Sequence, residues 1–114
     1  GLRHLLLPDH KEDIGHILEN IVYLELRRRY SQVYVGNLDK YEVDFVVVTD
    51  LGHYAYYQVS ETTLVPETLE RELRPLEAIK DQFPKYLLTM DTIQPTANYN
   101  GIEKKNIIDW LLEK

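Results

Sequence analysis

The chain has 114 residues, 44% of them hydrophobic and 28% charged, with a net charge of −6 and no cysteine. This length and composition suit one globular domain, residues 1–114, with a single core, and the lack of cysteine excludes disulfide bonds and thiolate metal sites. The acidic charge argues against tight binding of nucleic acid by the chain alone, because such binding depends mainly on lysine and arginine contacts to phosphate.

Apolar residues recur at helical spacing from Ile14 onward and predict a first helix over residues 12–29. The apolar stripe of this helix is formed by Ile14, Ile17, Leu18, Ile21, Val22 and Leu24. Glu19 falls just past one edge of the stripe, so we expect its carboxylate at the boundary between core and solvent. The arginines at 27–29 suit the negative end of the helix dipole.

Two β-prone runs, residues 41–49 and 53–60, flank a turn signal centred on Leu51 and predict a β-hairpin. Pairing that is symmetric about Leu51 places Asp44 opposite Gln58. Because side chains alternate along a strand, these two residues are expected to share one face of the hairpin.

A second helix is predicted to begin at Pro66 and to continue to Phe83, with Thr62 or Thr63 nearby as its cap. Pro75 lies inside this pattern and should kink the helix or divide it. The other expected elements are strands at residues 32–35, 86–90 and 105–108, a polar loop at 91–101 and a helical turn at 109–113. This order predicts an α/β fold in which helices flank a mixed sheet.

Three polar residues on predicted rigid elements could hold a metal ion. Hydrolysis of a phosphodiester by a divalent cation needs two or three hard oxygen ligands on such elements. Glu19, Asp44 and the side-chain oxygen of Gln58 could supply them, with the carbonyl of Val59 as a further ligand. These are therefore the candidate catalytic and metal-binding residues, with Mg²⁺ or Mn²⁺ as the expected cofactor, and the fold itself requires none.

The position two residues after Gln58 decides whether this set could catalyse hydrolysis. A basic side chain there would help to deprotonate water or to stabilise the developing charge, whereas Ser60 can do neither well. Losing such a group typically costs on the order of 10²- to 10⁴-fold in rate. Lys85, at the start of the next strand, could supply a displaced ammonium group.

Each candidate residue also has a simpler interpretation. Asp44 could be a strand-edge residue facing solvent, and Glu19 could be one more solvated helix carboxylate. Gln58 could serve only in cross-strand hydrogen bonding. The hypothesis of a site depends on their joint occurrence at these intervals.

Other residues likewise carry two interpretations. Glu25 lies near the centre of the apolar stripe and is expected either to pair with Arg28 or Arg29 or to reach solvent at the helix end. The arginines at 27–29 could contact phosphate but are more simply the charged end of a helix. The tyrosines at 54, 56 and 57 could stack on bases, although tyrosines on a sheet under a helix more commonly belong to the core.

Several segments resemble one particular kind of domain. They are residues 15–22 (GHILENIV), 42–46 (EVDFV), 57–60 (YQVS), 71–76 (RELRPL) and 86–91 (YLLTMD). The chain resembles, over nearly its full length, the uncharacterised restriction-endonuclease-like domain found at the C-terminus of prokaryotic AAA+-type ATP-binding proteins. Residues 1–3 are similar to the segment where such chains leave a winged-helix linker.

The resemblance implies the PD-(D/E)xK nuclease fold. In that fold Glu19 matches the acid of the first helix, Asp44 the central aspartate, and Gln58 the acid or glutamine that opens the last motif. Ser60 stands where active members of the superfamily carry lysine, which implies a degenerate active site. The domain would then be a fragment of a longer ATPase polypeptide, covalently linked to the ATPase domain as its partner.

Three functions are consistent with these patterns. The first is an accessory domain, non-catalytic or weakly catalytic, that serves regulation, partner docking or the positioning of nucleic acid. The alternative is a metal-dependent nuclease that hydrolyses DNA or RNA. The third is self-association into a homo-oligomer through an exposed strand edge. No apolar run approaches the length of a membrane span, so we expect no membrane partner and a cytoplasmic location.

Overall fold

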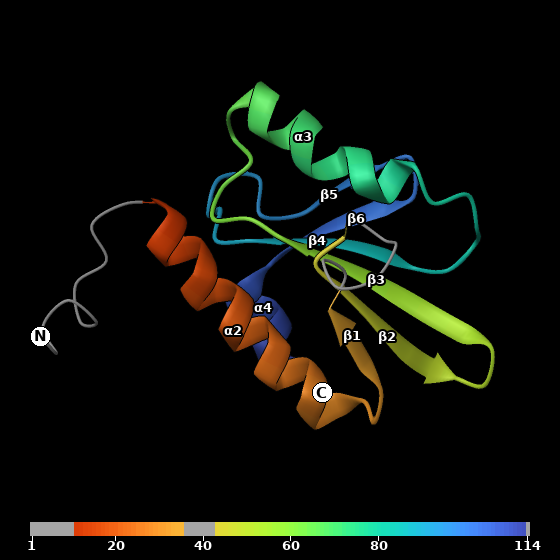
Figure 1. The fold of residues 1–114 in the computed structure, drawn as a ribbon. Helices are drawn as coiled ribbons and strands as arrows, with labels where there is room; N and C mark the ends of the chain where they lie inside the picture. The colour runs from red at the N-terminus through yellow and green to blue at the C-terminus, as the bar shows by residue number, and fades with distance from the viewer. Residues whose placement is uncertain (1–10, 36–42, 114) are drawn as a thin grey trace, which may run out of the picture.

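The computed structural model describes residues 11–35 and 43–113 of the chain. The helices are α2 (Lys11–Arg29), α3 (Pro66–Glu77) and α4 (Ile107–Leu112), and the strands are β1 (Val33–Val35), β2 (Phe45–Asp50), β3 (His53–Val59), β4 (Lys85–Thr89), β5 (Ala97–Tyr99) and β6 (Ile102–Asn106). The strands form one six-stranded sheet in the order β1-β2-β3-β4-β6-β5 (Figure 1). None of the described helices is long and apolar enough to cross a membrane.

The sheet is mixed, as the order of elements predicts. Strands β1, β2 and β3 pair in antiparallel fashion, β4 pairs in parallel with β3 and with β6, and β5 is antiparallel to β6. Helix α3 makes the connection between the parallel strands β3 and β4, which a short turn cannot span. The α/β class with helices flanking a mixed sheet is therefore confirmed.

The hairpin has the predicted register. Phe45 pairs with Tyr57 and Val47 with Ala55, symmetrically about Leu51. Beside it, Gly52 has a φ of 75°, which favours glycine at the turn. Strand β2 begins at Phe45 rather than at the predicted residue 41, and residues 41 and 42 lie outside the described part of the chain.

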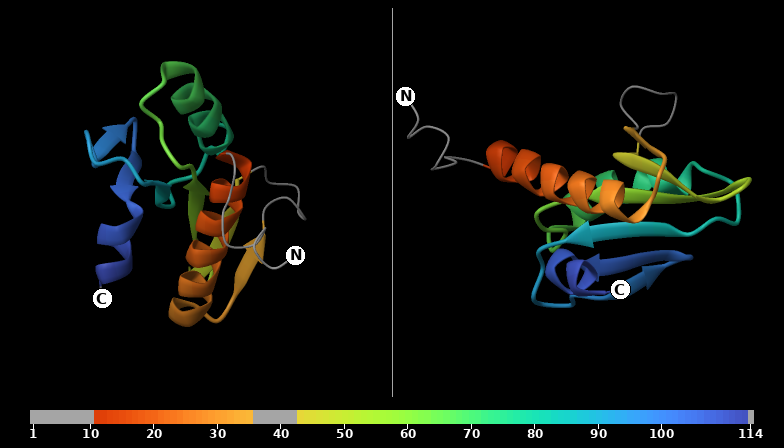
Figure 2. Two further views of the ribbon diagram at one scale, coloured as in Figure 1. Left: turned by 90° about the vertical axis from the view of Figure 1, so that its left-hand side faces the viewer. Right: turned by 90° about the horizontal axis from the view of Figure 1, so that it is seen from below.

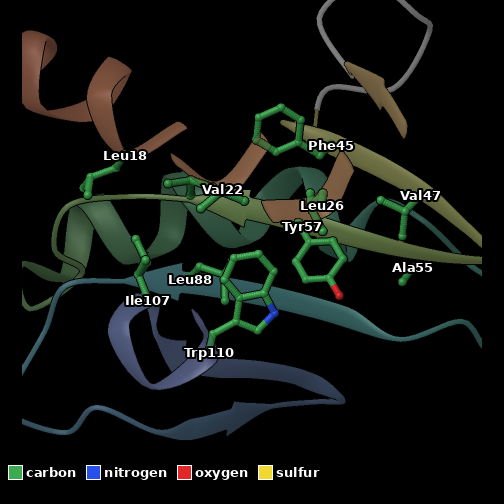
Figure 3. Close-up of a cluster of buried hydrophobic side chains, with 11 residues drawn as sticks. Leu18, Val22, Leu26, Phe45, Val47, Ala55, Tyr57, Leu88, Ile107 and Trp110 are labelled. Atoms are coloured by element: carbon green, nitrogen blue, oxygen red, sulfur yellow. The ribbon is translucent and has the colours of Figure 1, made fainter. Parts of the chain in front are cut away.

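One face of the sheet packs against α2 and α4, and the other packs against α3 (Figure 2). The first core is formed by Leu18, Val22, Leu26, Phe45, Val47, Ala55, Tyr57, Val59, Leu88, Ile107 and Trp110. Figure 3 draws these side chains between the helices and the strands. The second core joins Leu73 and Leu76 of α3 to the opposite face of the strands. Burial of both faces is the condition for parallel strands in a sheet.

The buried stripe of α2 is narrower than the sequence suggests. Leu18, Val22 and Leu26 are buried at successive four-residue intervals. In contrast, three residues of the predicted stripe are exposed: Ile17 (44%), Ile21 (38%) and Leu24 (67%). Ile14 and Tyr23 also pack against this core and are partly buried, whereas Ile17, Ile21 and Leu24 lie outside it.

Two of the three hairpin tyrosines belong to the core, as the simpler interpretation holds. Tyr56 is 2% exposed and Tyr57 is 3% exposed, and they lie in the two different cores. Tyr54 stays 37% exposed and packs edge to face against Phe83. Stacking on bases is therefore unavailable to the two buried rings.

Helix α3 begins at Pro66 as predicted, but its end and its cap differ from the prediction. It ends at Glu77 instead of Phe83, and Pro75 lies in its last turn without dividing it. The N-cap is Val65, which makes no side-chain cap. Thr62 and Thr63 are not caps, because both bind the carboxylate of Asp91.

The C-terminal part contains more sheet than predicted. The segment expected as a polar loop holds β5, and the last strand, β6, lies at Ile102–Asn106 instead of 105–108. The sequence pattern does not predict this strand correctly, because Lys104 occupies a core position and a lysine is rarely buried. It is 1% exposed, and its Nζ lies 2.8 Å from Oδ2 of Asp91. Helix α4 follows at once, with Asn106 as its N-cap.

Candidate functional site

Two hydrogen bonds connect Asp44 with Gln58 and Val59 at the open end of the hairpin. The backbone N–H of Asp44 donates to Oε1 of Gln58 over 2.9 Å. In return, Oδ2 of Asp44 accepts a hydrogen bond from the backbone N–H of Val59, also over 2.9 Å. The expected contact between the two residues is thus present, and it fixes the carboxylate of Asp44 beside the carboxyl end of β3.

Gln58 also binds a carboxylate that the sequence pattern does not single out. Its Nε2 donates to Oε1 of Glu72 on α3 over 2.9 Å. The orientation of the amide follows from the backbone donor of Asp44, which requires an oxygen opposite it. Gln58 is only 7% exposed, so both of its hydrogen bonds are partly buried. Gln58 therefore connects Asp44 to Glu72.

Glu19 lies between two surface hollows beside this pair. One hollow, of about 320 Å³, is lined by Glu19 and Asp44. The other, of about 470 Å³, is lined by Glu19, Val59 and Glu72 among others. The side chain of Glu19 is 40% exposed, which confirms its expected place at the edge of the core. The structure thus brings all four predicted residues and Glu72 to one end of the sheet.

The carboxylates at this end of the sheet destabilise one another's charge. Burial, which the hydrogen bond from Val59 opposes and the negative charges of Glu19 and Glu72 reinforce, raises the pKa of Asp44 to about 7. Burial also raises the pKa of Glu19, with Glu72 adding to the effect and His16 opposing it. A cation placed among these carboxylates would stabilise their ionised forms. It would offset both the cost of burying their charges and the repulsion between them.

The donor atoms suit a divalent cation in chemistry. Carboxylate oxygens are the ligands that Mg²⁺ and Mn²⁺ prefer, and Oε1 of Glu61, on the wall of the larger hollow, is buried without a hydrogen-bond partner. Within residues 11–35 and 43–113, however, no three His, Cys, Asp or Glu side chains are arranged so that they could hold a metal ion. Binding would therefore require a side-chain rotation, for which the half-exposed Glu19 has room.

The suggestion that Lys85 could supply the missing ammonium group is wrong. The Nζ of Lys85 donates to Oδ1 of Asp81 (2.8 Å), to the carbonyl of Asp81 (3.2 Å) and to the carbonyl of Phe83 (3.1 Å). These three bonds use all the donors of the ammonium group. Lys85 also lies at the amino end of β4, paired with Tyr56 rather than with Val59. It cannot serve a site at the carboxyl end of β3.

Ser60 is engaged in the loop that follows β3. Its hydroxyl donates to the carbonyl of Thr62 over 3.0 Å, although the residue still lines the larger hollow. Asp91, which lies close by, pairs with Lys104 and accepts hydrogen bonds from Thr62 and Thr63. Against the effect of burial, these contacts lower its pKa. Asp91 is therefore a structural residue and not a member of the candidate site.

Comparison with curated proteins finds two similar sequences, each belonging to a protein described as uncharacterized. One, from Haemophilus influenzae, is 36% identical over 113 residues, which cover 99% of this chain and 27% of that protein. The other, from Methanocaldococcus jannaschii, is 34% identical over 105 residues, which cover 83% of this chain and 21% of that protein. The chain thus spans about a quarter of the length of these relatives. No family model and no solved structure matches it.

Proposed function

We propose that this chain is a restriction-endonuclease-like accessory domain of a longer ATP-binding polypeptide. It binds a divalent cation at Glu19, Asp44 and Glu72 and uses it to position nucleic acid, with little or no hydrolysis. The observation that carries this proposal is the pair of hydrogen bonds by which Gln58 connects Asp44 to Glu72 beside Glu19.

The restriction-endonuclease-like assignment is supported by the placement of the matched residues. Glu19 comes from the first described helix, Asp44 from the entry to a central strand, and Gln58 from the end of the next strand. These are the positions that the sequence resemblance assigns to the acids of the PD-(D/E)xK fold. The order of elements, with α3 crossing between parallel strands, is also consistent with that fold.

The lack of a lysine among the described residues at the site supports weak or absent hydrolysis. Ser60 occupies the lysine position, and Lys85 is committed to Asp81. Among the described residues that line the two hollows there is no lysine. A bound cation would supply charge neutralisation and lower the pKa of a bound water, while the chain's own residues hold Asp44 and Glu72 in place.

A role within a larger polypeptide is supported by the length of the relatives, each of which continues far beyond the part that matches this chain. The sequence resemblance suggests that the additional part carries an ATPase. An acidic domain bound covalently to such a partner does not need high intrinsic affinity for nucleic acid, because linkage raises the effective concentration.

Calorimetric titration with Mn²⁺ and Mg²⁺ tests the proposal. We expect binding that Glu19→Ala weakens and Asp44→Asn nearly abolishes, since the asparagine can still accept the hydrogen bond from Val59 but carries no charge. Asp50→Asn, at an exposed carboxylate outside the site, is the matched control. If the wild-type chain takes up neither metal, or if Asp44→Asn binds as well as wild type, the proposal is wrong.

The second candidate function is metal-dependent hydrolysis of DNA or RNA. It is favoured by one observation, a positive charge on the wall of the larger hollow, supplied by Arg71. A panel of single-stranded, branched and plasmid substrates with Mn²⁺ tests it. Cleavage that disappears in Glu19→Ala would support it, and no cleavage across the panel would exclude it.

A further inference from the structure

Helix α3 presents one polar face to the larger hollow. Thr68, Arg71 and Glu72 line it together, and their spacing of three and four residues places them on one side of the helix. On the adjacent side of the helix, Leu73 and Leu76 are buried in the core. The position of Arg71 beside the candidate site is therefore fixed by the packing of α3, not by the flexibility of a loop.

Arg71 supplies the permanent positive charge among the described residues that line this hollow. Glu19, Glu61 and Glu72 are acidic, and the hydroxyl of Ser60 is bonded to the adjacent loop. His16 is 77% exposed and lies 3.9 Å from Glu19. Of the described residues that line the hollow, Arg71 alone is charged positively at every ordinary pH.

Arg71 is only loosely held by protein groups. Its Nη2 lies 3.7 Å from Oε2 of Glu72, beyond hydrogen-bond distance, and its side chain is 70% exposed. Most of its donors are therefore free to bind a ligand. A guanidinium group binds two oxygens of one phosphate at once, which a histidine or a serine cannot do.

We infer that Arg71 binds a phosphate of a nucleic-acid backbone that the cation at Glu19, Asp44 and Glu72 draws into the larger hollow. This inference rests on the proposed function, because the acidic wall would repel phosphate without a cation. Arginine keeps its proton, so Arg71 holds phosphate and cannot act as a base. Arg71 thus replaces the charge of the missing lysine but not its proton transfer.

The test is binding of a short fluorescein-labelled single-stranded DNA, followed by fluorescence anisotropy in Mn²⁺ and in EDTA. Arg71→Ala is compared with Arg74→Ala, which removes an equally exposed arginine from the same helix, paired with Glu70 and outside the hollow. In Mn²⁺ we expect Arg71→Ala to weaken binding by about tenfold, the loss typical of one charge-assisted hydrogen bond, and Arg71→Lys to recover part of it.

Two further measurements separate this inference from the proposed function. Calorimetry should give Arg71→Ala and wild type the same affinity for Mn²⁺ alone, and Arg74→Ala should bind DNA as wild type does. If Arg71→Ala binds DNA as wild type does, or if Arg74→Ala loses as much, the role of Arg71 is wrong while the cation site stands. If the wild-type chain binds no Mn²⁺, or binds DNA equally in Mn²⁺ and EDTA, both are wrong.

Discussion

Gln58 and Glu72 are joined by a hydrogen bond of 2.9 Å from Nε2 to Oε1, which connects the carboxyl end of β3 to the middle of α3. A carboxylate in place of Gln58 would repel Glu72, whereas an amide can donate to it. The same amide accepts from the backbone of Asp44. Glutamine thus holds two carboxyl-bearing segments together without a metal ion, which explains the use of an amide at this position.

Replacing this amide by a carboxylate should make stability depend on metal. In EDTA, we expect Gln58→Glu to lower the free energy of unfolding by about 2 kcal/mol, because Glu72 loses a buried donor and gains a negative neighbour. Saturating Mn²⁺ should restore most of this loss by binding only the folded state. Urea unfolding with and without metal measures both effects.

The control for that variant is Gln82→Glu, which adds the same charge at an exposed position. It should change stability by no more than about 0.5 kcal/mol in either condition. Equal stability of Gln58→Glu and wild type in EDTA would contradict the structural role of the amide.

The raised pKa of Asp44 predicts a loss of stability as pH rises. Its pKa is about 7 in the folded chain against an ordinary value of 3.8, so between these values the folded state keeps a proton that the unfolded state has released. The free energy of unfolding should therefore fall by up to ~1.4 kcal/mol per pH unit from about pH 4 to about pH 7 and then level off. The raised pKa of Glu19 acts in the same direction.

Urea unfolding in EDTA between about pH 5 and pH 8 measures this slope. Asp44→Asn should flatten it and be more stable than wild type at the upper end, because the buried group no longer ionises. Asp50→Asn, at an exposed carboxylate, should keep the wild-type slope. A slope that Asp44→Asn leaves unchanged would assign the titration to another group.

The ion pair between Asp91 and Lys104 should be essential to the fold. The two side chains are each 2% exposed and lie 2.8 Å apart. Lys104→Met leaves the carboxylate buried without its cation, and we expect a loss of about 3–5 kcal/mol in the free energy of unfolding. Arg74→Met breaks an exposed pair with Glu70 and should cost less than about 1 kcal/mol. Similar losses in the two variants would refute the distinction.

Arg29 should contribute to stability and not to phosphate binding. Its guanidinium donates to the carbonyls of Trp110 (2.8 Å) and Glu113 (3.0 Å), and lies 4.6 Å from the centre of the Trp110 ring. Arg29 and Arg28 both donate to the carboxylate of Glu25, which confirms the expected pairing of Glu25 with these arginines. Arg29→Ala should lower the unfolding free energy by about 2 kcal/mol.

Arg27→Ala is the comparison for this arginine, because Arg27 is exposed on the same helix turn. It should leave stability within about 0.5 kcal/mol of wild type. Thermal and urea unfolding give the two values. If binding of single-stranded DNA falls in Arg29→Ala while stability does not, the arginines at 27–29 would have the phosphate role that we infer for Arg71.

Local patterns predicted the elements whose residues carry a clear period. The helix at α2, the hairpin about Leu51 and the start of α3 at Pro66 were all predicted closely, because turns, proline and apolar spacing act within a few residues. The strands β5 and β6 were missed or displaced. Lys104 and its charged neighbours conceal β6, since a buried lysine is stable there only through Asp91, on a neighbouring strand's end.

The sequence by itself determined the α/β class, the hairpin register and the choice of Glu19, Asp44 and Gln58, because periodicity and turn chemistry are local. Only the tertiary structure decided what surrounds those residues. In it, Glu72 binds Gln58, Arg71 lies on the wall of the larger hollow, and Lys85 lies at the amino end of β4, away from the site. These contacts depend on how α3 crosses the sheet between β3 and β4, and packing across the sheet joins residues that no local pattern connects.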